Sequence, residues 1–285
     1  MQTFITRSLS AIVFAFIVIS AVLYNEMSFE ILFFIISIAC LHEYYKIIPK
    51  FFKKDVHFQP LYKYIGMTIG ITLYLFSFLI GKGILPHSYI ALFPIFLSVF
   101  LIIELFIKSK RPFRNIGLNL IGIFYISLPY ALLHGITYHQ GVFVGPIIFG
   151  ILLCVWTNDT GAYIVGSLIG KHKLMEHISP KKTIEGSLGG AISTVGVAYC
   201  LSQCTSSFSW LNSFQIIDLN GWLIIAVLVF VFASLGDLIE SLLKRSLEIK
   251  DSGSIMPGHG GFLDRFDAFI FVVPFIVAFL LIYLN

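Results

Sequence analysis

The fold class follows from one stretch, WLIIAVLVFVFASLGDLIESLL at residues 222–243, and from eight others of the same kind. A run of about 20 mostly apolar residues is long enough to cross the hydrocarbon core of a membrane as a helix. The eight others lie at residues 8–24, 29–45, 64–80, 89–107, 118–136, 142 to about 169, 187–201 and 268–284. The sequence therefore predicts an all-α polytopic membrane protein with about nine transmembrane helices.

The composition agrees with a chain that is surrounded by lipid. Of its 285 residues, 58% are hydrophobic and only 12% are charged, and the mean hydropathy is +0.92. A soluble domain carries about 25% charged and 45–50% apolar residues. Disordered, collagen-like and coiled-coil chains are excluded by the same figures, and so is a small secreted disulfide scaffold.

The basic residues predict the orientation of the helices. Eighteen of the 19 Lys and Arg residues fall on connections at one side of the predicted bundle, and Lys82 alone falls on the other. Because cytoplasmic connections carry the excess of Lys and Arg, we expect a cytoplasmic N-terminus and a C-terminus outside. The net charge of +4 is thus explained by topology, with attraction of anionic lipid or phosphate as a second use, and no nucleic-acid partner is expected.

Polar residues inside the apolar runs gather in the second half of the chain. We expect residues 1–140 to form an N-terminal transmembrane bundle of about five helices. Residues 141–285 are expected to form a catalytic transmembrane region with a cytoplasmic-side active site. In the first region Glu104 stands out inside a span, and we expect it to reach the membrane surface or to pair with Lys108, one turn on.

Several acids lie where a membrane helix disfavours them. A carboxylate at the centre of such a helix costs on the order of 2.5–3.5 kcal/mol, so each one predicts a functional site. Asp159 lies well inside the sixth predicted span, in the stretch WTNDTGAY at residues 156–163. Asp237, Glu240, Ser241 and Lys244 follow one another at i, i+3, i+4 and i+7, which places them on one stripe of the eighth span.

A second pair of acids, Asp264 and Asp267, repeats the i, i+3 spacing at the start of the ninth span. Four carboxylates on two neighbouring helices repel one another unless a cation lies between them. Oxygen ligands of this kind suit Mg²⁺, which also takes ligands from substrate phosphates. The alternative is a structural network, because polar stripes also link membrane helices through hydrogen bonds and ion pairs.

Two connections on the predicted cytoplasmic side are suited to bind phosphate. The first reads KDSGSIMPGHGGFLDR at residues 250–265, and its glycines let backbone N–H groups form an anion-binding concavity beside His259. The second reads SPKKTIEGSLGG at residues 179–190, where Lys181 and Lys182 suit a triphosphate as point charges. Topology alone would explain these lysines but not the adjoining Thr183, Glu185 and glycines. Together with the acids, they indicate phosphoryl or nucleotidyl transfer to a lipid.

The segment 241–267 resembles the signature of the phosphatidate cytidylyltransferase (CDP-diacylglycerol synthase) family, bacterial type. That signature has a serine, then Lys-Arg, Lys-Asp, His-Gly-Gly, Asp-Arg and a final aspartate at fixed spacing. Its positions are filled here by Ser241, Lys244, Arg245, Lys250, Asp251, His259, Gly260, Gly261, Asp264, Arg265 and Asp267. The stretch 159–190 is similar to the family's second shared segment.

The resemblance implies the reaction CTP + phosphatidate → CDP-diacylglycerol + pyrophosphate, in phospholipid biosynthesis. It implies Mg²⁺ as cofactor, leaves open a second metal ion, and names Asp237, Asp264, Asp267 and Glu240 as metal ligands. The groups expected to hold phosphates are Lys244, Arg245, Lys250, Arg265, Lys181 and Lys182, and those expected near CTP include Asp159, Thr183, Glu185, Gly260 and Gly261. CTP, phosphatidate and membrane lipids are the expected partners, the bacterial inner membrane the expected location, and a homodimer is implied by the resemblance alone.

Two other functions stay open at this point. A CTP-dependent lipid-alcohol kinase, acting on a polyprenol or phytol, would share the surroundings of Asp159 and the Lys-Thr-x-Glu-Gly segment but not the signature at 241–267. An ion-coupled transporter would explain Asp159 and Asp237 as an ion path, but would give the Gly-His-Gly-Gly loop no purpose.

Overall fold

The computed structural model describes residues 2–52, 60–107, 109, 111–139, 142–204, 211–255 and 260–284. Within these residues the regular secondary structure is helical apart from two short antiparallel hairpins. The long helices are α1 (Gln2–Tyr24), α2 (Glu26–Ile47), α3 (Pro60–Gly81), α4 (Phe93–Phe106), α5 (Pro112–Gly122), α8 (Pro146–Ile169), α9 (Ile184–Ser202), α10 (Leu219–Ser246) and α11 (Leu263–Tyr283). The short ones are η1 (Ile48–Phe52), η2 (His87–Leu92), η3 (Ile123–Ser127), α6 (Leu128–Leu132), α7 (His134–Thr137) and η4 (Leu211–Ile216). The hairpins pair β1 (Tyr138–His139) with β2 (Val142–Phe143), and β3 (Lys173–Met175) with β4 (Ser179–Thr183).

Eight helical segments in the described part of the chain are long and apolar enough to cross a membrane. They are Glu26–Phe51, Leu61–Gly81, His87–Phe106, Pro112–Thr137, Pro146–Ile169, Ile184–Ser202, Leu219–Ser246 and Leu263–Tyr283. The first of the nine predicted spans corresponds to α1, whose described apolar part, Leu9–Tyr24, is shorter than the other eight. The prediction of an all-α polytopic membrane protein is confirmed.

Two predicted spans differ in detail from the structure. The fifth is not one regular helix, since α5 continues through the π-helical turn η3 into α6 and α7. The sixth was expected to begin at residue 142, but residues 142–143 form β2 and the helix begins at Pro146. Proline suits the first turn of a helix because the N–H that it lacks would have no partner there.

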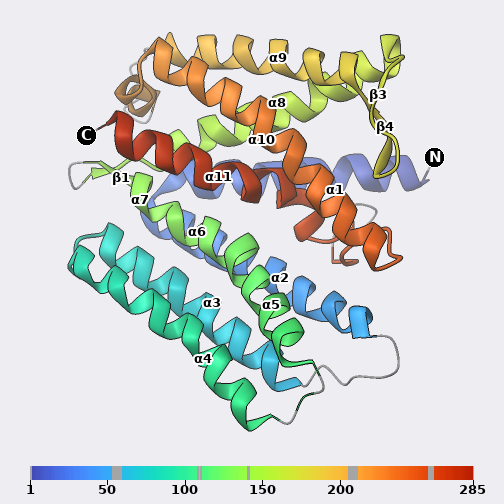
Figure 1. Ribbon diagram of the computed structural model, residues 1–285. Helices are drawn as coiled ribbons and strands as arrows, with labels where there is room; N and C mark the ends of the chain where they lie inside the picture. The colour runs from blue at the N-terminus through green and yellow to red at the C-terminus, as the bar shows by residue number, and fades with distance from the viewer. Residues whose placement is uncertain are drawn as a thin grey trace.

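The helices run between two ends of one bundle, and the two chain termini lie at opposite ends of it (Figure 1). α8, α9 and α10 pack on one another along one side, α11 and α1 lie in the middle, and α3 and α4 form the far side. The β3–β4 hairpin, the end of α10 and the start of α11 all lie at the end that holds the N-terminus. This arrangement agrees with the predicted alternation of the helices, while the assignment of that end to the cytoplasm stays a prediction.

The seventh span, α9, is rich in glycine because it packs very closely on α8. A Cβ atom at Gly190 would lie 2.7 Å from the backbone oxygen of Asn158, and one at Gly186 would lie 2.7 Å from that of Ala162. Small residues at a membrane helix contact allow this close approach. The contact fixes β4, which leads into α9, against the end of α8.

The two ends of the α10–α11 pair are both held by polar contacts. At the outer end of the predicted topology, the side chain of Asp218 caps α10 by accepting from the backbone N–H of Gly221 at 2.7 Å. The Tyr283 hydroxyl of α11 also donates to Asp218, and these two hydrogen bonds lower the pKa of that carboxyl. The other end of the pair carries the acids that the sequence analysis singled out.

The main hydrophobic core includes residues from both sides of position 140. The ring centroid of Phe33 on α2 lies 6.2 Å from that of Tyr130 on α6 and 6.0 Å from that of Phe269 on α11. A separate small cluster of Ile69, Phe100 and Ile123 holds α3 and α4 to η3. The proposed division into residues 1–140 and 141–285 stays a prediction, and a shared core joins the two parts.

Glu104 on α4 does not reach the membrane surface as expected. Its carboxylate is buried, and it accepts hydrogen bonds from the Tyr62 hydroxyl and, at 3.0 Å, from the Asn115 side-chain amide. The other expected partner, Lys108, lies outside the described residues. Glu104 therefore links α3, α4 and α5 through buried hydrogen bonds.

Candidate active site

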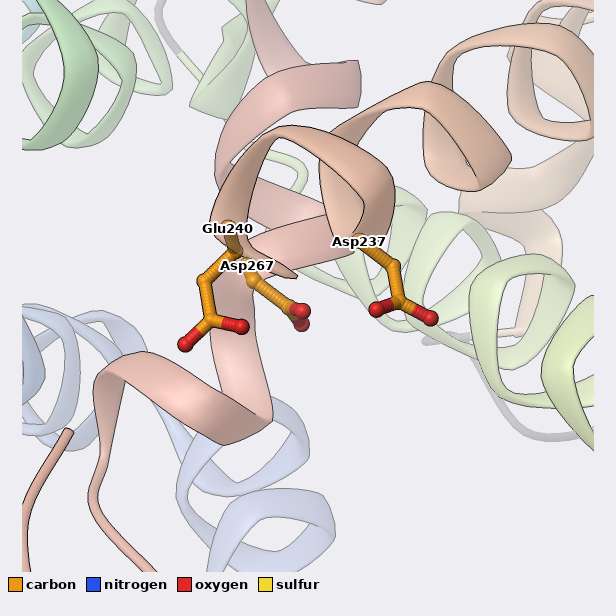
Figure 2. A group of neighbouring side chains, drawn as sticks. All are labelled: Asp237, Glu240 and Asp267. Atoms are coloured by element: carbon orange, nitrogen blue, oxygen red, sulfur yellow. The ribbon is translucent and has the colours of Figure 1, made fainter. Parts of the chain in front are cut away.

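Three carboxylates meet where α10 and α11 pack together. One oxygen of each of Asp237, Glu240 and Asp267 lies within 4.8 Å of the others. Figure 2 shows the three side chains, two from α10 and one from α11, extending in the same direction from the two helices. Glu240 is completely buried and Asp267 is 9% exposed, whereas Asp237 is half-buried. The i, i+3 spacing within α10 has therefore placed two of the predicted acids on one face, as expected.

Lys244 joins this group to the fourth predicted acid. Its ammonium forms ion pairs with Glu240, one turn earlier on α10, and with Asp264 on α11, where Nζ lies 2.9 Å from Oδ1. Glu240 and Asp264 are both largely buried, so a missing partner would leave a charge uncompensated in the protein. Lys244 is thus held between two acids rather than free to follow a ligand.

Asp264 organises the loop that leads into α11. Its Oδ2 accepts from the backbone N–H of Ser252 at 2.9 Å, from that of Gly261 at 2.8 Å, and lies 3.0 Å from the Ser252 hydroxyl. Asp264 does not belong to the group of three carboxylates, although its side chain also contacts that of Glu240, a member of the group. Its role as a metal ligand stays a prediction.

The lysine-rich hairpin reaches the acids from α8 and α9. Lys182 on β4 forms an ion pair with Asp237 on α10, so the segment 159–190 meets one of the acids of α10. Asp159 on α8 is exposed on the described surface and lies within electrostatic reach of Asp237, Lys182 and Arg265. The predicted nucleotide-binding and metal-binding residues therefore share one location.

Two residues predicted near CTP have structural contacts. The Thr183 side chain caps α9 by accepting from the backbone N–H of Gly186 at 3.2 Å, and it is buried. Glu185 accepts from the backbone N–H of Lys171 at 3.0 Å and lies 2.6 Å from Nδ1 of His172. These contacts hold the hairpin in shape, and a direct role of either residue in binding CTP stays a prediction.

The remaining predicted residues line the same end of the bundle. Ser241 donates to Oδ1 of Asp237 at 3.3 Å and supports that acid. Exposed side chains that can meet a substrate belong to Lys181, Arg245, Lys250, Asp251 and Arg265. His259 lies outside the described residues.

The loop needs glycine at two positions because carboxylates lie very close to its backbone there. Gly260 has a φ of 87°, a conformation that other residues rarely adopt, and a Cβ there would lie 2.6 Å from Oδ2 of Asp264. A Cβ at Gly261 would overlap the carboxylate of Glu43, a residue of α2. Both glycines therefore have a structural reason to be where they are, and a role in binding phosphate stays a prediction.

Glu43 is the residue at this site that the sequence analysis missed. Its carboxylate is buried and accepts from the backbone N–H groups of Phe262 and Leu263, each at 3.0 Å. The signal was present in the sequence, because Glu43 is an acid inside an apolar run, the same criterion that singled out Asp159. The N-terminal half of the chain thus contributes directly to the arrangement of the site.

The group of three carboxylates fits a divalent cation. Oxygen ligands from Asp237, Glu240 and Asp267 are the kind that Mg²⁺ prefers, and the spacing brings one oxygen from each together. Within the described residues no hydrogen-bond donor reaches the buried Oε1 of Glu240, so this atom is available as a ligand. With lysines on two sides, such a site can hold and neutralise phosphate groups beside a membrane.

Nearly the whole chain is similar to one family of enzymes. The model of the cytidylyltransferase family matches residues 5–283. The phosphatidate cytidylyltransferase of Bacillus subtilis is 33% identical over 289 residues, which cover 96% of this chain and 95% of that protein. The enzymes of the same name from Staphylococcus epidermidis and Staphylococcus haemolyticus are 38% and 41% identical over 68% and 59% of this chain, and over 66% and 60% of their own lengths. The resemblance read from residues 241–267 is confirmed, and this chain belongs to the cytidylyltransferase family.

Proposed function

We propose that this protein is a phosphatidate cytidylyltransferase of the bacterial plasma membrane, which converts CTP and phosphatidate into CDP-diacylglycerol and pyrophosphate. The observation that carries the proposal is the ion pair between Lys182 and Asp237. It brings a lysine-bearing hairpin suited to a triphosphate against a group of acids suited to a metal. Relatives named for this activity, which match almost all or large parts of the chain, support the same reaction.

The reaction needs two phosphate-bearing substrates at one place. An oxygen of the phosphatidate phosphate forms a new bond to the α-phosphorus of CTP, and the bond from that phosphorus to the pyrophosphate group breaks. We assign the triphosphate of CTP to Lys181 and Lys182, and the phosphatidate headgroup to the exposed basic residues Arg245, Lys250 and Arg265. Such transfer requires mainly in-line positioning and neutralisation of charge, both of which fixed basic side chains supply.

We assign the divalent cation, Mg²⁺, to Asp237, Glu240 and Asp267. When bound there, it neutralises charge on the transferring phosphate group. The resemblance also implies Asp264 as a metal ligand. Its Oδ1 atom is paired with Nζ of Lys244 and can bind a metal only when that ion pair breaks. While the pair is intact, Asp264 holds Lys244 and the loop at 252–261 in place.

The proposed location follows from the same residues. The active site lies at the end of the bundle where the basic connections lie, and we place this end at the cytoplasmic surface, where CTP is available. Phosphatidate, whose acyl chains stay in the bilayer, then meets CTP at the boundary between lipid and water. A homodimer stays a prediction from the resemblance.

The position of the label in CTP decides between this reaction and a lipid-alcohol kinase. The purified full chain is incubated in detergent micelles with Mg²⁺ and CTP labelled at either the α- or the γ-phosphate, with phosphatidate or a polyprenol as acceptor. We expect the α-label to enter the lipid phase with phosphatidate and the γ-label to stay in water as pyrophosphate. Transfer of the γ-label to the polyprenol would replace the proposal by a kinase, and no transfer of either label would contradict both.

A further inference from the structure

The buried carboxylate of Glu43 faces the loop that leads into α11. Glu43 is 1% exposed and lies near the end of α2, far in sequence from its partners. It accepts from the backbone N–H of Phe262 to Oε1 and from that of Leu263 to Oε2, each at 3.0 Å. The Ser252 hydroxyl lies 2.9 Å from Oε2 as well. Among the described residues, all of the hydrogen bonds that Glu43 makes through its carboxylate thus go to Ser252, Phe262 and Leu263.

Helix α11 has no cap from its own sequence. Its first residue follows Phe262, whose side chain makes no capping hydrogen bond. The first N–H groups of a helix need acceptors from outside the helix, and the positive end of the helix dipole favours a carboxylate there. Glu43 supplies this acceptor from a different helix, so the position of the start of α11 depends on α2.

The loop is shaped around this carboxylate. A Cβ atom at either Gly253 or Gly261 would overlap the side-chain oxygens of Glu43. The same loop is held on its other face by Asp264, whose Oδ2 lies 3.0 Å from the Ser252 hydroxyl. Since a hydroxyl has one proton, Ser252 donates to only one of the two carboxylates at a time, and it links them.

We propose that Glu43 is a positioning residue for the active site, acting through the start of α11 and the loop at 252–261. Asp264 and Asp267 lie within the first turns of α11, so any rotation or fraying of its start moves both acids and Lys244, which is paired with Asp264. Glu43 itself need not touch either substrate. The effect on turnover rests on the proposed function, whereas the effect on the order of the loop does not.

The chain offers a matched control on the same helix. Glu30 is also a buried carboxylate of α2, but it bonds the Tyr74 hydroxyl at 3.1 Å and Nε2 of His134 at 2.9 Å, close to the other end of the bundle. Glu43→Gln and Glu30→Gln each remove a buried negative charge from α2 and should both lower the melting temperature. A merely structural role for Glu43 predicts that the two variants behave alike in every other measurement.

The test compares both variants with the unaltered full chain in detergent micelles. For Glu43→Gln we expect kcat to fall roughly 10–100-fold with KM for CTP changed less than threefold, because the reacting groups are displaced while the exposed binding residues remain. For Glu30→Gln we expect kcat within about twofold of the unaltered chain. An unchanged kcat in Glu43→Gln, or equal losses in both variants, would overturn the proposal.

Amide hydrogen exchange gives a readout that needs no activity. Peptides that cover residues 252–264 should exchange at least about tenfold faster in Glu43→Gln, and at the original rate in Glu30→Gln, since Glu43 accepts from the N–H groups of Phe262 and Leu263 and Glu30 makes no contact there. If Glu43→Gln fails to fold, Ser252→Ala removes only one of the three contacts and should change exchange in the same peptides. Uniform exchange across the variants refutes the positioning role even if the enzyme is active, and an inactive wild-type protein with the expected exchange pattern refutes only the proposed function.

Discussion

Lys182 on β4 forms an ion pair with Asp237 on α10, and this contact joins the two sequence segments that carry the site. One segment brings lysines from the hairpin between α8 and α9, and the other brings acids from the α10–α11 contact. Each segment alone has an ordinary explanation, since lysines set topology and acids can link helices. Their contact makes a single site for a metal and a triphosphate the simpler explanation of both.

Replacement of Lys182 should weaken CTP binding. Lys182→Met removes a charged group beside Asp237, and a charge-assisted contact of about 1.5–3 kcal/mol corresponds to a rise of roughly 10–100-fold in KM for CTP. Lys173→Met, at an exposed position of the paired strand β3, is the matched control, and we expect a change of less than about threefold. Initial rates measured over a series of CTP concentrations provide the comparison, and equal effects of the two changes would speak against the assignment of Lys182.

Loss of an acid from the group of three should abolish stabilisation by Mg²⁺. An ion at about 100 times its Kd stabilises a folded protein by about 2.7 kcal/mol, which appears as a rise in melting temperature. We expect this rise in the unaltered protein and its absence in Asp237→Asn and Asp267→Asn. Asp218→Asn, which alters an acid at the other end of α10, should keep it. Thermal unfolding with and without Mg²⁺ checks the metal site independently of turnover.

Asp264→Asn should remove activity while the protein still inserts into the membrane. The change takes one of the two charged partners from Lys244 and weakens the hold on the loop, and disruption of a buried pair of this kind costs about 3–5 kcal/mol. We expect CDP-diacylglycerol formation to fall by roughly 10²-fold or more. Glu248→Gln, an exposed acid between α10 and the loop, is the control, and membrane fractions show whether each protein is inserted. Turnover of Asp264→Asn at the original rate would contradict the placement of Asp264 in the site.

A methyl group added at Gly261 should disturb the site far more than a methyl group added at Gly196 on α9. In Gly261→Ala the new Cβ would overlap Glu43 and the Ser252 hydroxyl, so the loop has to move, and we expect a fall in kcat of roughly 10-fold or more. Gly196→Ala on α9 places its Cβ in open space and should leave kcat unchanged, with a gain of up to about 1 kcal/mol in helix stability. Activity should therefore fall only in Gly261→Ala, whereas the melting temperature should fall in Gly261→Ala and rise slightly in Gly196→Ala.

Reporters fused to the two ends of the chain should lie on opposite sides of the membrane. The termini lie at opposite ends of the bundle, and the distribution of basic residues assigns the N-terminus to the cytoplasm. We expect an N-terminal fusion to report the cytoplasm and a C-terminal fusion to report the outside. The same side for both fusions would contradict the arrangement of the helices, and reversed sides would contradict only the orientation.

The sequence predicts the spans well because hydropathy alone decides where a membrane helix can lie. The predicted bounds of α2, α3 and α10 agree with the structure to within a few residues. Helix periodicity also places Asp237 and Glu240 on one face of α10. Neither signal contains information on which helices pack together, so the meeting of Lys182 with Asp237 was not predictable from spacing.

The different contacts of the individual acids were harder to predict from the sequence. Asp264 and Asp267 have the same i, i+3 spacing as the pair on α10, yet Asp264 faces Lys244 and the loop while Asp267 joins the group of three. Glu43 was not predicted because the polar residues inside apolar runs are concentrated in the second half of the chain, although Glu43 is itself an acid inside an apolar run. The partners of Glu43 are backbone N–H groups, and a pattern of side chains in the sequence does not predict such partners.

The dependence of α11 on Glu43 has a consequence for how the protein is made. Leu263 follows Glu43 by 220 residues, so at 5–20 residues per second the ribosome needs roughly 10–45 s to produce the partner of this carboxylate. During that time the acid is present in α2, whereas the backbone N–H groups of Phe262 and Leu263 that it binds do not yet exist. A chain that ends before α11 therefore lacks the backbone N–H group of Leu263 that Glu43 binds in the folded protein.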